Sequence, residues 1–261
     1  MTSDARLAVV LLAAGSGQRL GFGIPKAKVL LGEEPILRHA LASVTAAGLA
    51  DHLVVAVPQD DAPGEGSLRE VIEHFRREHP EASWELSVVS GGSTRADSVA
   101  RALEVLDGVE HVLVHDAARP LVPVQVFQRV ADALRAGAQA VIPAVPVVDT
   151  IKQVRPGEGA EAGISPELVA ANIPRDTLRA VQTPQGFQLS ALRAAHQEAR
   201  QLDDEQAAAI TDDAMLMEAR GVPVHVVAGS SYSLKITTPV DLILAEGLLE
   251  GPLASRWMEE A

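Results

Sequence analysis

Short apolar runs alternate with amphipathic segments along most of the chain. The apolar runs are rich in β-branched residues, which is typical of strands buried on both faces of a sheet. They lie at Arg6–Ala13, His52–Val57, Glu85–Val89, His111–His115 and Gln139–Ala144. Apolar residues recur at helical spacing in the segments between them, Ile36–Ala47, Ser67–Glu78, Thr94–Leu106 and Pro123–Arg135. This alternation predicts an α/β fold with a doubly wound, mainly parallel sheet.

One segment, about 146–186, breaks this alternation. It is rich in Pro, Gly, Glu and Ala and holds only short β-like pieces. Because a long structureless loop is unusual inside a compact domain, we expect a projecting β-arm that pairs with another subunit. After it, the pattern predicts helices at Leu189–Gln201 and Thr211–Arg220, a strand at Val224–Val227, and a last helix with Thr238 as N-cap and Pro239 first. We expect one domain over 1–250 and a tail at 251–261.

Composition narrows the class of protein. Hydrophobic residues make up 47% of the 261 residues, which indicates a globular chain. No apolar run approaches the roughly 18–20 residues of a membrane span, and Asp4 argues against a signal peptide. The absence of cysteine excludes disulfides and thiolate metal sites and fits the cytoplasmic location that we expect. A formal net charge of −13 argues against nucleic acid or an anionic membrane as the main partner.

A glycine-rich loop that carries cations follows the first strand. It runs from Ala13 to Lys26 and includes Gly15, Gly17 and Arg19. It is neither a P-loop nor a complete dinucleotide fingerprint, because Leu20 occupies the place of the third glycine. Glycines let the backbone approach a phosphate closely, and Arg19 and Lys26 could grip a triphosphate. The alternative is a tight strand–helix turn with solvated charges.

Two further polar segments follow later strands. Ser90–Ser98 joins a strand to a helix and could bind an anion or a base edge, or it could be an ordinary helix cap. His115–Pro120 offers Asp116 for a Mg²⁺-associated or hydroxyl-orienting role and Arg119 for phosphate. An Asp–Arg pair that only stabilises the loop is the alternative, and we expect His115 to be packed rather than catalytic.

Four other segments are weaker when taken alone. They are Asp149–Lys152, Thr183–Gln185, Thr211–Asp213 and Ser233–Thr237. Thr211 could be a helix N-cap, with Asp212 and Asp213 favourable to the helix dipole, and Lys235 could be a surface charge. No Ser/His/Asp triad or zinc-ligand spacing occurs, so covalent or zinc catalysis has little support. In open α/β sheets, ligands bind at the carboxyl ends of the strands, where these clusters lie.

Taken together and in order, the motifs resemble those of the 2-C-methyl-D-erythritol 4-phosphate cytidylyltransferases. The matching strings extend over about 240 residues: AAGSGQRLGFGIPK, GGSTRADSV, VHDAARP, PVVDTIK, TPQGF, TDDA and LKITTPVDL. The resemblance implies a Rossmann-like nucleotidyltransferase that binds CTP, methylerythritol phosphate and Mg²⁺. It also implies a homodimer formed through the arm.

The resemblance also implies roles for individual residues. Catalytic cations would be Arg19, Lys26 and Lys235. Nucleotide contacts would come from Ala14, Gly15, Gly17, Gly92, Arg95, Ser98 and Ala117. The acceptor would be held by Asp116, Arg119, Thr183 and Thr211, with Thr150 and Arg175 of the arm reaching the partner subunit's substrate. No metal ligand is certain, because the CTP phosphates would hold Mg²⁺ with at most Asp116 assisting.

The expected reaction is in-line attack of the acceptor phosphate on the α-phosphorus of CTP, which needs no strong base. A ribitol-5-phosphate cytidylyltransferase has very similar motifs and is the nearest alternative. A nucleotide-binding regulator without catalysis is the alternative of another class. It would not need the second-substrate residues Asp116, Thr183, Thr211 and Lys235.

Overall fold

A computed structural model describes residues 5–157, 167–201 and 210–250. Within this part of the chain an eight-stranded sheet runs in the order β10-β7-β11-β6-β1-β4-β5, with β12 also paired to β7. Its strands are β1 (Leu7–Leu12), β4 (His52–Val57), β5 (Glu85–Ser90), β6 (His111–Asp116), β7 (Ala140–Pro146), β10 (Arg179–Val181), β11 (Gln185–Gln188) and β12 (Val224–Ala228). The sheet is mainly parallel, and β10 and β11 are antiparallel to their neighbours. The predicted fold class is confirmed.

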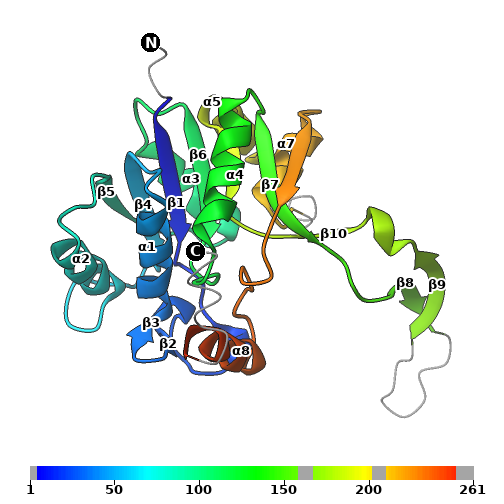
Figure 1. Ribbon diagram of the computed structural model, residues 1–261, viewed down its shortest axis with the longest axis horizontal. Coiled ribbons are helices and arrows are strands. Elements are labelled where there is room, and N and C mark those ends of the chain that lie inside the picture. The colour runs from blue at the N-terminus through cyan, green and yellow to red at the C-terminus, as the bar shows by residue number, and fades with distance from the viewer. Residues whose placement is uncertain (1–4, 158–166, 202–209, 251–261) are drawn as a thin grey trace.

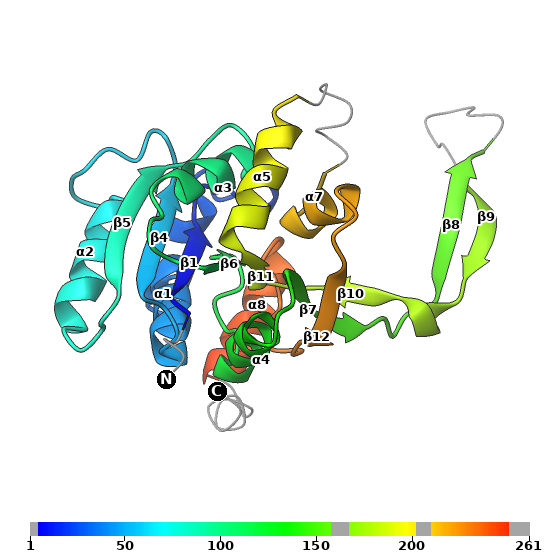
Figure 2. The same cartoon turned by 90° about the horizontal axis from the view of Figure 1, so that it is seen from above.

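Helices cover both faces of this sheet (Figures 1 and 2). One face packs against α1 (Ile36–Ala47), α2 (Leu68–Glu78) and α4 (Val124–Arg135), and the other against α3 (Arg95–Glu104), α5 (Leu189–Ala199) and α7 (Asp213–Ala219). The central strand β1 contributes side chains to the cores on both faces of the sheet. Leu7, Val9 and Leu11 enter the first core, whereas Ala8 and Val10 enter the second, because side chains alternate along a strand.

A smaller third core lies beyond the carboxyl edge of the sheet. Here α8 (Pro239–Glu250) packs near the short hairpin of β2 (Leu30–Leu31) and β3 (Glu34–Pro35). Leu20 of the glycine-rich loop, Val29, Ile236 and Ala245 share this core. It therefore anchors the start of α8 and the glycine-rich loop against each other. The described residues contain no helix long and apolar enough to cross a membrane.

Side chains cap the first turns of α2 and α8. Ser67 caps α2 by accepting from the Glu70 N–H at 3.0 Å, and the Glu70 carboxylate accepts from the Gly66 N–H. The last helix begins at Pro239 as expected. Thr238 is at the N-cap position, also as expected, and its carbonyl accepts from the Asp241 N–H. The Asp241 carboxylate in turn accepts from the Thr237 and Thr238 N–H groups.

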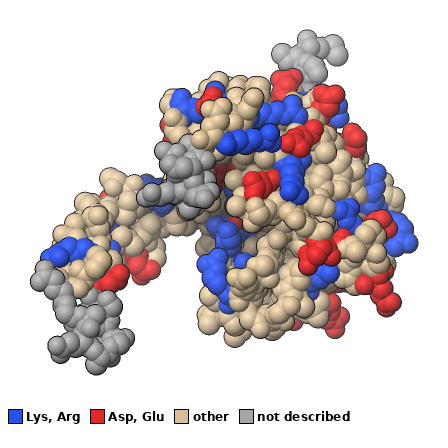
Figure 3. All heavy atoms as spheres, turned by 180° about the vertical axis from the view of Figure 1, so that it is seen from behind, with Lys and Arg blue, Asp and Glu red and all other residues tan. Residues whose placement is uncertain are grey.

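The projecting arm is shorter than the 146–186 predicted. Among the described residues, the hairpin of β8 (Ile151–Pro156) and β9 (Glu167–Ile173) extends away from the sheet, together with the segments that join it to β7 and β10 (Figures 1 and 3). After it, β10 returns to pair with β7, and β11 inserts between β6 and β7. The returning segment is apolar enough to join the sheet, with Phe187 fully buried. The predicted tail at 251–261 lies outside the described residues.

Candidate active site

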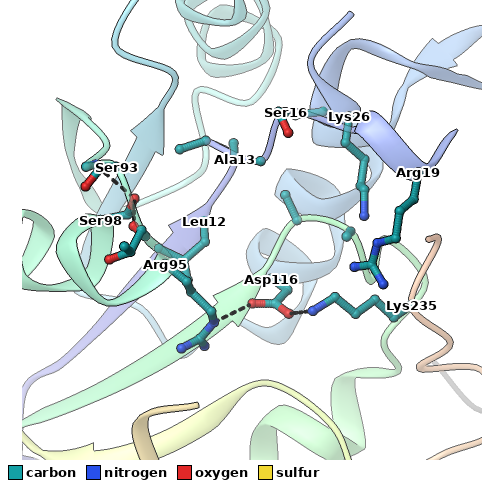
Figure 4. A pocket seen from close by; sticks show the side chains of 17 residues that line it. Leu12, Ala13, Ser16, Arg19, Lys26, Ser93, Arg95, Ser98, Asp116 and Lys235 are labelled. Atoms are coloured by element: carbon teal, nitrogen blue, oxygen red, sulfur yellow. Dashed lines mark hydrogen bonds and ion pairs between the residues drawn. The ribbon is translucent and has the colours of Figure 1, made fainter. Parts of the chain in front are cut away.

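The polar segments that follow β1, β5 and β6 meet at one edge of the sheet. They do so because the three strands are parallel and neighbouring or next-neighbouring, so their carboxyl ends lie on the same side. The segment before α8 approaches from the other side and brings Lys235 (Figure 4). Together they enclose a cavity of about 390 Å³. It is lined by Leu12, Ala13, Ala14, Gly15, Ser16, Arg19, Lys26, Ala27, Gly92, Ser93, Thr94, Arg95, Ser98, Asp116, Ala117, Ala118 and Lys235.

Gly15 and Gly17 are glycines for different structural reasons: Gly15 is open to the cavity, whereas Gly17 is enclosed in the turn of the loop. A Cβ on Gly15 would meet no protein atom within 4 Å, and Gly15 lines the cavity. Gly17 has a φ of 72°, and a Cβ there would lie 3.0 Å from the Ile24 carbonyl oxygen and the Lys26 nitrogen. Gly17 is not among the residues that line the cavity. Gly17 therefore shapes the turn that returns Lys26 to the cavity, and its expected nucleotide contact stays a prediction.

The second loop is tightened around the start of α3. Thr94 caps this helix in a complete capping box with Asp97. The Ser98 hydroxyl accepts from the Gly92 N–H at 3.0 Å and donates to the Thr94 carbonyl at 2.9 Å. A Cβ on Gly92 would lie 2.0 Å from the Asp97 Cβ, so only glycine fits. Ser98 thus supports the loop as well as lining the cavity.

Cations converge on one buried carboxylate. Asp116 ends β6, and its Oδ2 accepts from Lys235 Nζ at 2.6 Å while Oδ1 lies 3.4 Å from Arg95 Nε. Burial alone would raise the pKa of Asp116, but Arg95 and Lys235 outweigh it and hold that pKa well below its usual range. Asp116 is therefore ionised at neutral pH and fixes the orientation of both cations.

Arg19 and Lys26 face the same space from the glycine-rich loop (Figure 4). Burial, then the nearby charges of Lys235 and Arg19, lower the pKa of Lys26. Cations held this close repel one another unless an anion lies between them. The arrangement is therefore suited to a polyphosphate, whose oxygens would relieve that repulsion.

A second cavity of about 220 Å³ adjoins the first. Its lining consists of Arg95, Asp116, Arg119, Val181, Gln182, Thr183, Gln185, Thr211, Asp212 and Lys235. The two cavities therefore share Arg95, Asp116 and Lys235. The Thr183 hydroxyl accepts from the Asp116 N–H at 3.1 Å, which ties the segment before β11 to the end of β6.

Arg119 and His115 complete this wall. Arg119 donates to the Ser233 carbonyl at 2.6 Å and to the Val181 carbonyl at 3.3 Å. His115 is fully buried against Phe127, with Nδ1 2.9 Å from the Thr183 hydroxyl. Burial lowers the pKa of His115 to about 4, so it is neutral at pH 7. His115 is thus packed, as expected.

Thr150 and Arg175 lie apart from both cavities. Both are exposed near the base of the projecting hairpin, and the Arg175 guanidinium donates to the Val148 carbonyl. Within one chain neither residue is among those that line the two cavities. Their expected role at a partner subunit's substrate therefore stays a prediction.

Sequence reasoning misplaced several residues near the site. Asp212, not Thr211, caps α7. Asp213 lies in the first turn of α7, where it favours the helix dipole as expected, but it is also a buried ion-pair partner of Arg95. Ser16, Ser93, Thr94 and Gln185 also line the cavities. Adjacency to the predicted motifs could have indicated all four. No local signal distinguishes Asp213 as buried, because its partner lies 118 residues away.

The side chains at this site could bind a metal ion only if the substrate supplied most of the metal's ligands. Among the described residues no group of three or more His, Cys, Asp or Glu side chains could hold a metal ion. Asp116 is the one carboxylate among the described residues lining the larger cavity, and both of its oxygens already face cations. A divalent ion here would take its ligands mainly from phosphate oxygens, as Mg²⁺ commonly does.

Comparison with known proteins identifies the family. The model of the family described as IspD, 2-C-methyl-D-erythritol 4-phosphate cytidylyltransferase, matches residues 7–251. The chain belongs to this family. The match covers every segment that reaches the two cavities.

Relatives and solved structures of the IspD family agree over most of the chain. The 2-C-methyl-D-erythritol 4-phosphate cytidylyltransferase of Streptomyces coelicolor is 46% identical over 250 residues, covering 95% of this chain and 86% of that protein. The enzyme of the same name from Thermus thermophilus is 34% identical, with a TM-score of 0.68 over 94% of this chain and 98% of that one. The 4-diphosphocytidyl-2C-methyl-D-erythritol synthase of Anaerococcus prevotii has a TM-score of 0.76 at 26% identity, covering 95% of this chain and 100% of that one.

Proposed function

We propose that this protein transfers the cytidylyl group of CTP to 2-C-methyl-D-erythritol 4-phosphate, which gives 4-diphosphocytidyl-2-C-methyl-D-erythritol and pyrophosphate. The observation that carries the proposal is the pair of adjoining cavities that share Arg95, Asp116 and Lys235. A transferase needs two substrates to meet at one point, whereas a nucleotide-binding regulator needs one cavity. Membership of the IspD family supports both the reaction and the choice of substrates.

The larger cavity would hold CTP. The base and ribose would lie along the second loop, where Gly92 and Ser98 leave backbone groups close to a ligand. The triphosphate would lie along the glycine-rich loop, where Gly15 is open to the cavity and Arg19 and Lys26 face it. Glycine backbone approaching a phosphate and cations beside it are the usual elements of such a site.

The smaller cavity would hold the acceptor. Arg119 and Lys235 offer positive charge to its phosphate, while Thr183, Thr211 and Asp212 offer hydroxyl and carboxylate groups to its polyol chain. The phosphate would thereby lie at the shared wall, next to the α-phosphorus of CTP. A ribitol phosphate would present similar groups, so the experiment below compares the two acceptors.

The chemistry follows from this placement. An acceptor phosphate oxygen attacks the α-phosphorus, a new P–O bond forms, and the bond from the α-phosphorus to the bridging oxygen of pyrophosphate breaks. A phosphate monoester is already nucleophilic, so no base is required, in keeping with the neutral and buried His115. Arg19, Lys26 and Lys235 would stabilise the charge that develops on the α-phosphoryl oxygens and on pyrophosphate. Bound Mg²⁺ would add charge neutralisation on the phosphates.

The arm supports assembly into a homodimer. An isolated two-stranded hairpin is at best marginally stable in water, and β8 and β9 leave Val154, Leu168 and Val169 substantially exposed. A second copy of the chain would cover these residues. It would also receive Thr150 and Arg175 near its acceptor cavity.

Pyrophosphate release from the purified protein tests the proposal. The protein is mixed with CTP, Mg²⁺ and methylerythritol phosphate, with ribitol 5-phosphate as the parallel acceptor and ATP, GTP and UTP in place of CTP. Release with CTP and methylerythritol phosphate only is expected. Release with ribitol 5-phosphate only would reassign the acceptor, and no release with either acceptor would overturn the proposed activity.

A further inference from the structure

Polar side chains from four elements form a continuous series of contacts behind the wall that the two cavities share. Asp116 at the end of β6 faces Arg95, the first residue of α3, at 3.4 Å. Arg95 Nη1 donates to Asp213 Oδ2 at 2.6 Å, and Asp213 is the first residue of α7. His196 of α5 donates through Nε2 to Asp213 Oδ1 at 2.9 Å. We call these four residues the relay.

The inner half of the relay is sealed from solvent and from substrate. The side chains of Asp213 and His196 are 1% and 6% exposed. Burial would raise the pKa of Asp213, but Arg95 and the hydrogen bond from His196 outweigh it and lower that pKa. Neither residue is among those lining the cavities, so neither can contact a substrate. Asp213 is therefore an ionised group whose contacts are with Arg95 and His196.

We propose that Asp213 and His196 are positioning residues, which hold the Arg95 guanidinium, and through it the Asp116 carboxylate, where the two substrates meet. This inference rests on the proposed function. Without Asp213, Arg95 would keep only its 3.4 Å contact to Asp116, and a long cationic side chain would be free to turn toward the phosphates. Its charge would then stabilise the bound substrate as much as the transition state, which lowers kcat without weakening binding.

Asp213 follows directly on residues of the acceptor cavity, so its positioning role concerns both cavities. Thr211 and Asp212, the two residues before it, line the acceptor cavity, and Gln185 Nε2 donates to Asp212 at 2.9 Å. The Asp213–Arg95 pair therefore connects the segment that lines the acceptor cavity to the helix that begins beside the nucleotide cavity. A displacement of the segment at the acceptor cavity would therefore also displace the start of α3, and the reverse.

Asp213→Asn tests the positioning role, because asparagine keeps the size of the side chain and removes its charge. We expect kcat to fall roughly 10- to 100-fold while KM for CTP stays near the wild-type value, as for a misplaced catalytic group. His196→Ala should lower kcat less, and His196→Gln should restore it because the amide can donate to Asp213. The double variant Asp213→Asn/His196→Ala should be no slower than Asp213→Asn alone.

Met217→Ala is the matched control for stability. Met217 is fully buried on α7 and belongs to the same core as Leu192 of α5, but it has no part in the relay. This variant should melt at a lower temperature yet keep the wild-type kcat per folded molecule. An Asp213→Asn enzyme with wild-type kcat, or a Met217→Ala enzyme that loses as much, would overturn the positioning role.

A crystal structure of the Asp213→Asn variant gives a readout that needs no turnover. We expect the Arg95 guanidinium to be displaced from its wild-type position, and an unmoved guanidinium would overturn the proposal. Failure of the proposed function has a different signature, because the wild-type protein would then release no pyrophosphate whatever the state of the relay.

Discussion

Gly15 and Gly92 border the same cavity, but for different physical reasons. A Cβ on Gly15 would meet open space within the cavity, so Gly15→Ala should fold normally and hinder the triphosphate. A Cβ on Gly92 would overlap Asp97 at 2.0 Å, so Gly92→Ala should disturb the loop itself. We expect Gly15→Ala to raise KM for CTP with an unchanged melting temperature. Gly92→Ala should raise KM for CTP and also lower the melting temperature.

Gly247→Ala is the control for this pair. Gly247 lies in α8, and a Cβ there also meets no atom within 4 Å, but it is remote from the cavity lining. The control should keep the wild-type KM and be equally or slightly more stable, because alanine favours helix by roughly 1 kcal/mol over glycine. A wild-type KM for Gly15→Ala would show that the triphosphate does not lie against this loop.

Lys26 is the residue whose loss should most directly reduce the chemical step. Lys26→Ala removes one charge from the cluster that faces the developing negative charge, so kcat should fall by more than ~10²-fold. Steady-state kinetics of pyrophosphate release measure the effect. Arg200→Ala, which removes a positive charge from an exposed ion pair with Glu104, should leave kcat unchanged. A near-normal rate for Lys26→Ala would end its catalytic assignment.

Because His115 is buried and neutral, we expect the folded protein to lose stability in mild acid. The unfolded chain binds a proton on this histidine below about pH 6.5, but in the folded chain its pKa is lowered to about 4. The unfolded state therefore binds more protons between these values, so stability falls as pH falls through that window, by up to about 3 kcal/mol. The depressed pKa of Asp116 acts only at lower pH, because an unfolded aspartate protonates below about 4.

Urea unfolding of His115→Gln at pH 7 and pH 4.5 measures this contribution. The variant should lose less stability between the two pH values than the wild-type protein. His74→Gln, which alters an exposed histidine on α2, should lose as much as the wild type. Equal losses in all three proteins would exclude His115 as a source of the acid sensitivity.

At the scale of elements, the apolar pattern of the sequence predicted the bounds of buried strands and helices better than the structure of the segments that connect them. The strand at His52–Val57 and the helix at Ile36–Ala47 have the predicted bounds, because their apolar spacing is strict and a turn follows each. Assigning residues 179–186 to the arm was wrong, since β10 and the start of β11 lie there and are part of the main sheet. Both strands are short and gain their strand structure from pairing with β6 and β7. Such pairing depends on partners about 35 to 75 residues away.

The arm hairpin should govern assembly. Replacing Leu168 and Val169 with aspartate puts charge on apolar positions of β9 that a second copy would cover, so the dimer should dissociate. Sedimentation equilibrium measures the mass, and turnover should fall with it because Thr150 and Arg175 would no longer reach a partner. Val105→Asp, at an apolar residue of similar exposure beyond α3, should remain dimeric. An unchanged mass for the β9 variant would contradict assembly through the arm.

At the scale of the whole molecule, a chain of net charge −13 brings its cations together where the sheet ends. On the face shown in Figure 3, acidic and basic side chains are intermingled. The sequence could predict that the motifs after β1, β5 and β6 reach one cavity, because these strands are parallel and their carboxyl ends lie at the same edge of the sheet. It could not predict that Asp213 and His196 lie behind the cavity wall, since that depends on how α5 packs on α3 and α7.

The fate of the α-phosphorus tests the central claim most directly. The protein is incubated with CTP labelled with ³²P at the α-position, Mg²⁺ and methylerythritol phosphate, and the products are separated. We predict that the label appears in a cytidine diphosphate ester of methylerythritol, with unlabelled pyrophosphate in equal amount. Label recovered as CMP, or as CDP while the acceptor gains only the γ-phosphate, would contradict cytidylyl transfer at this site.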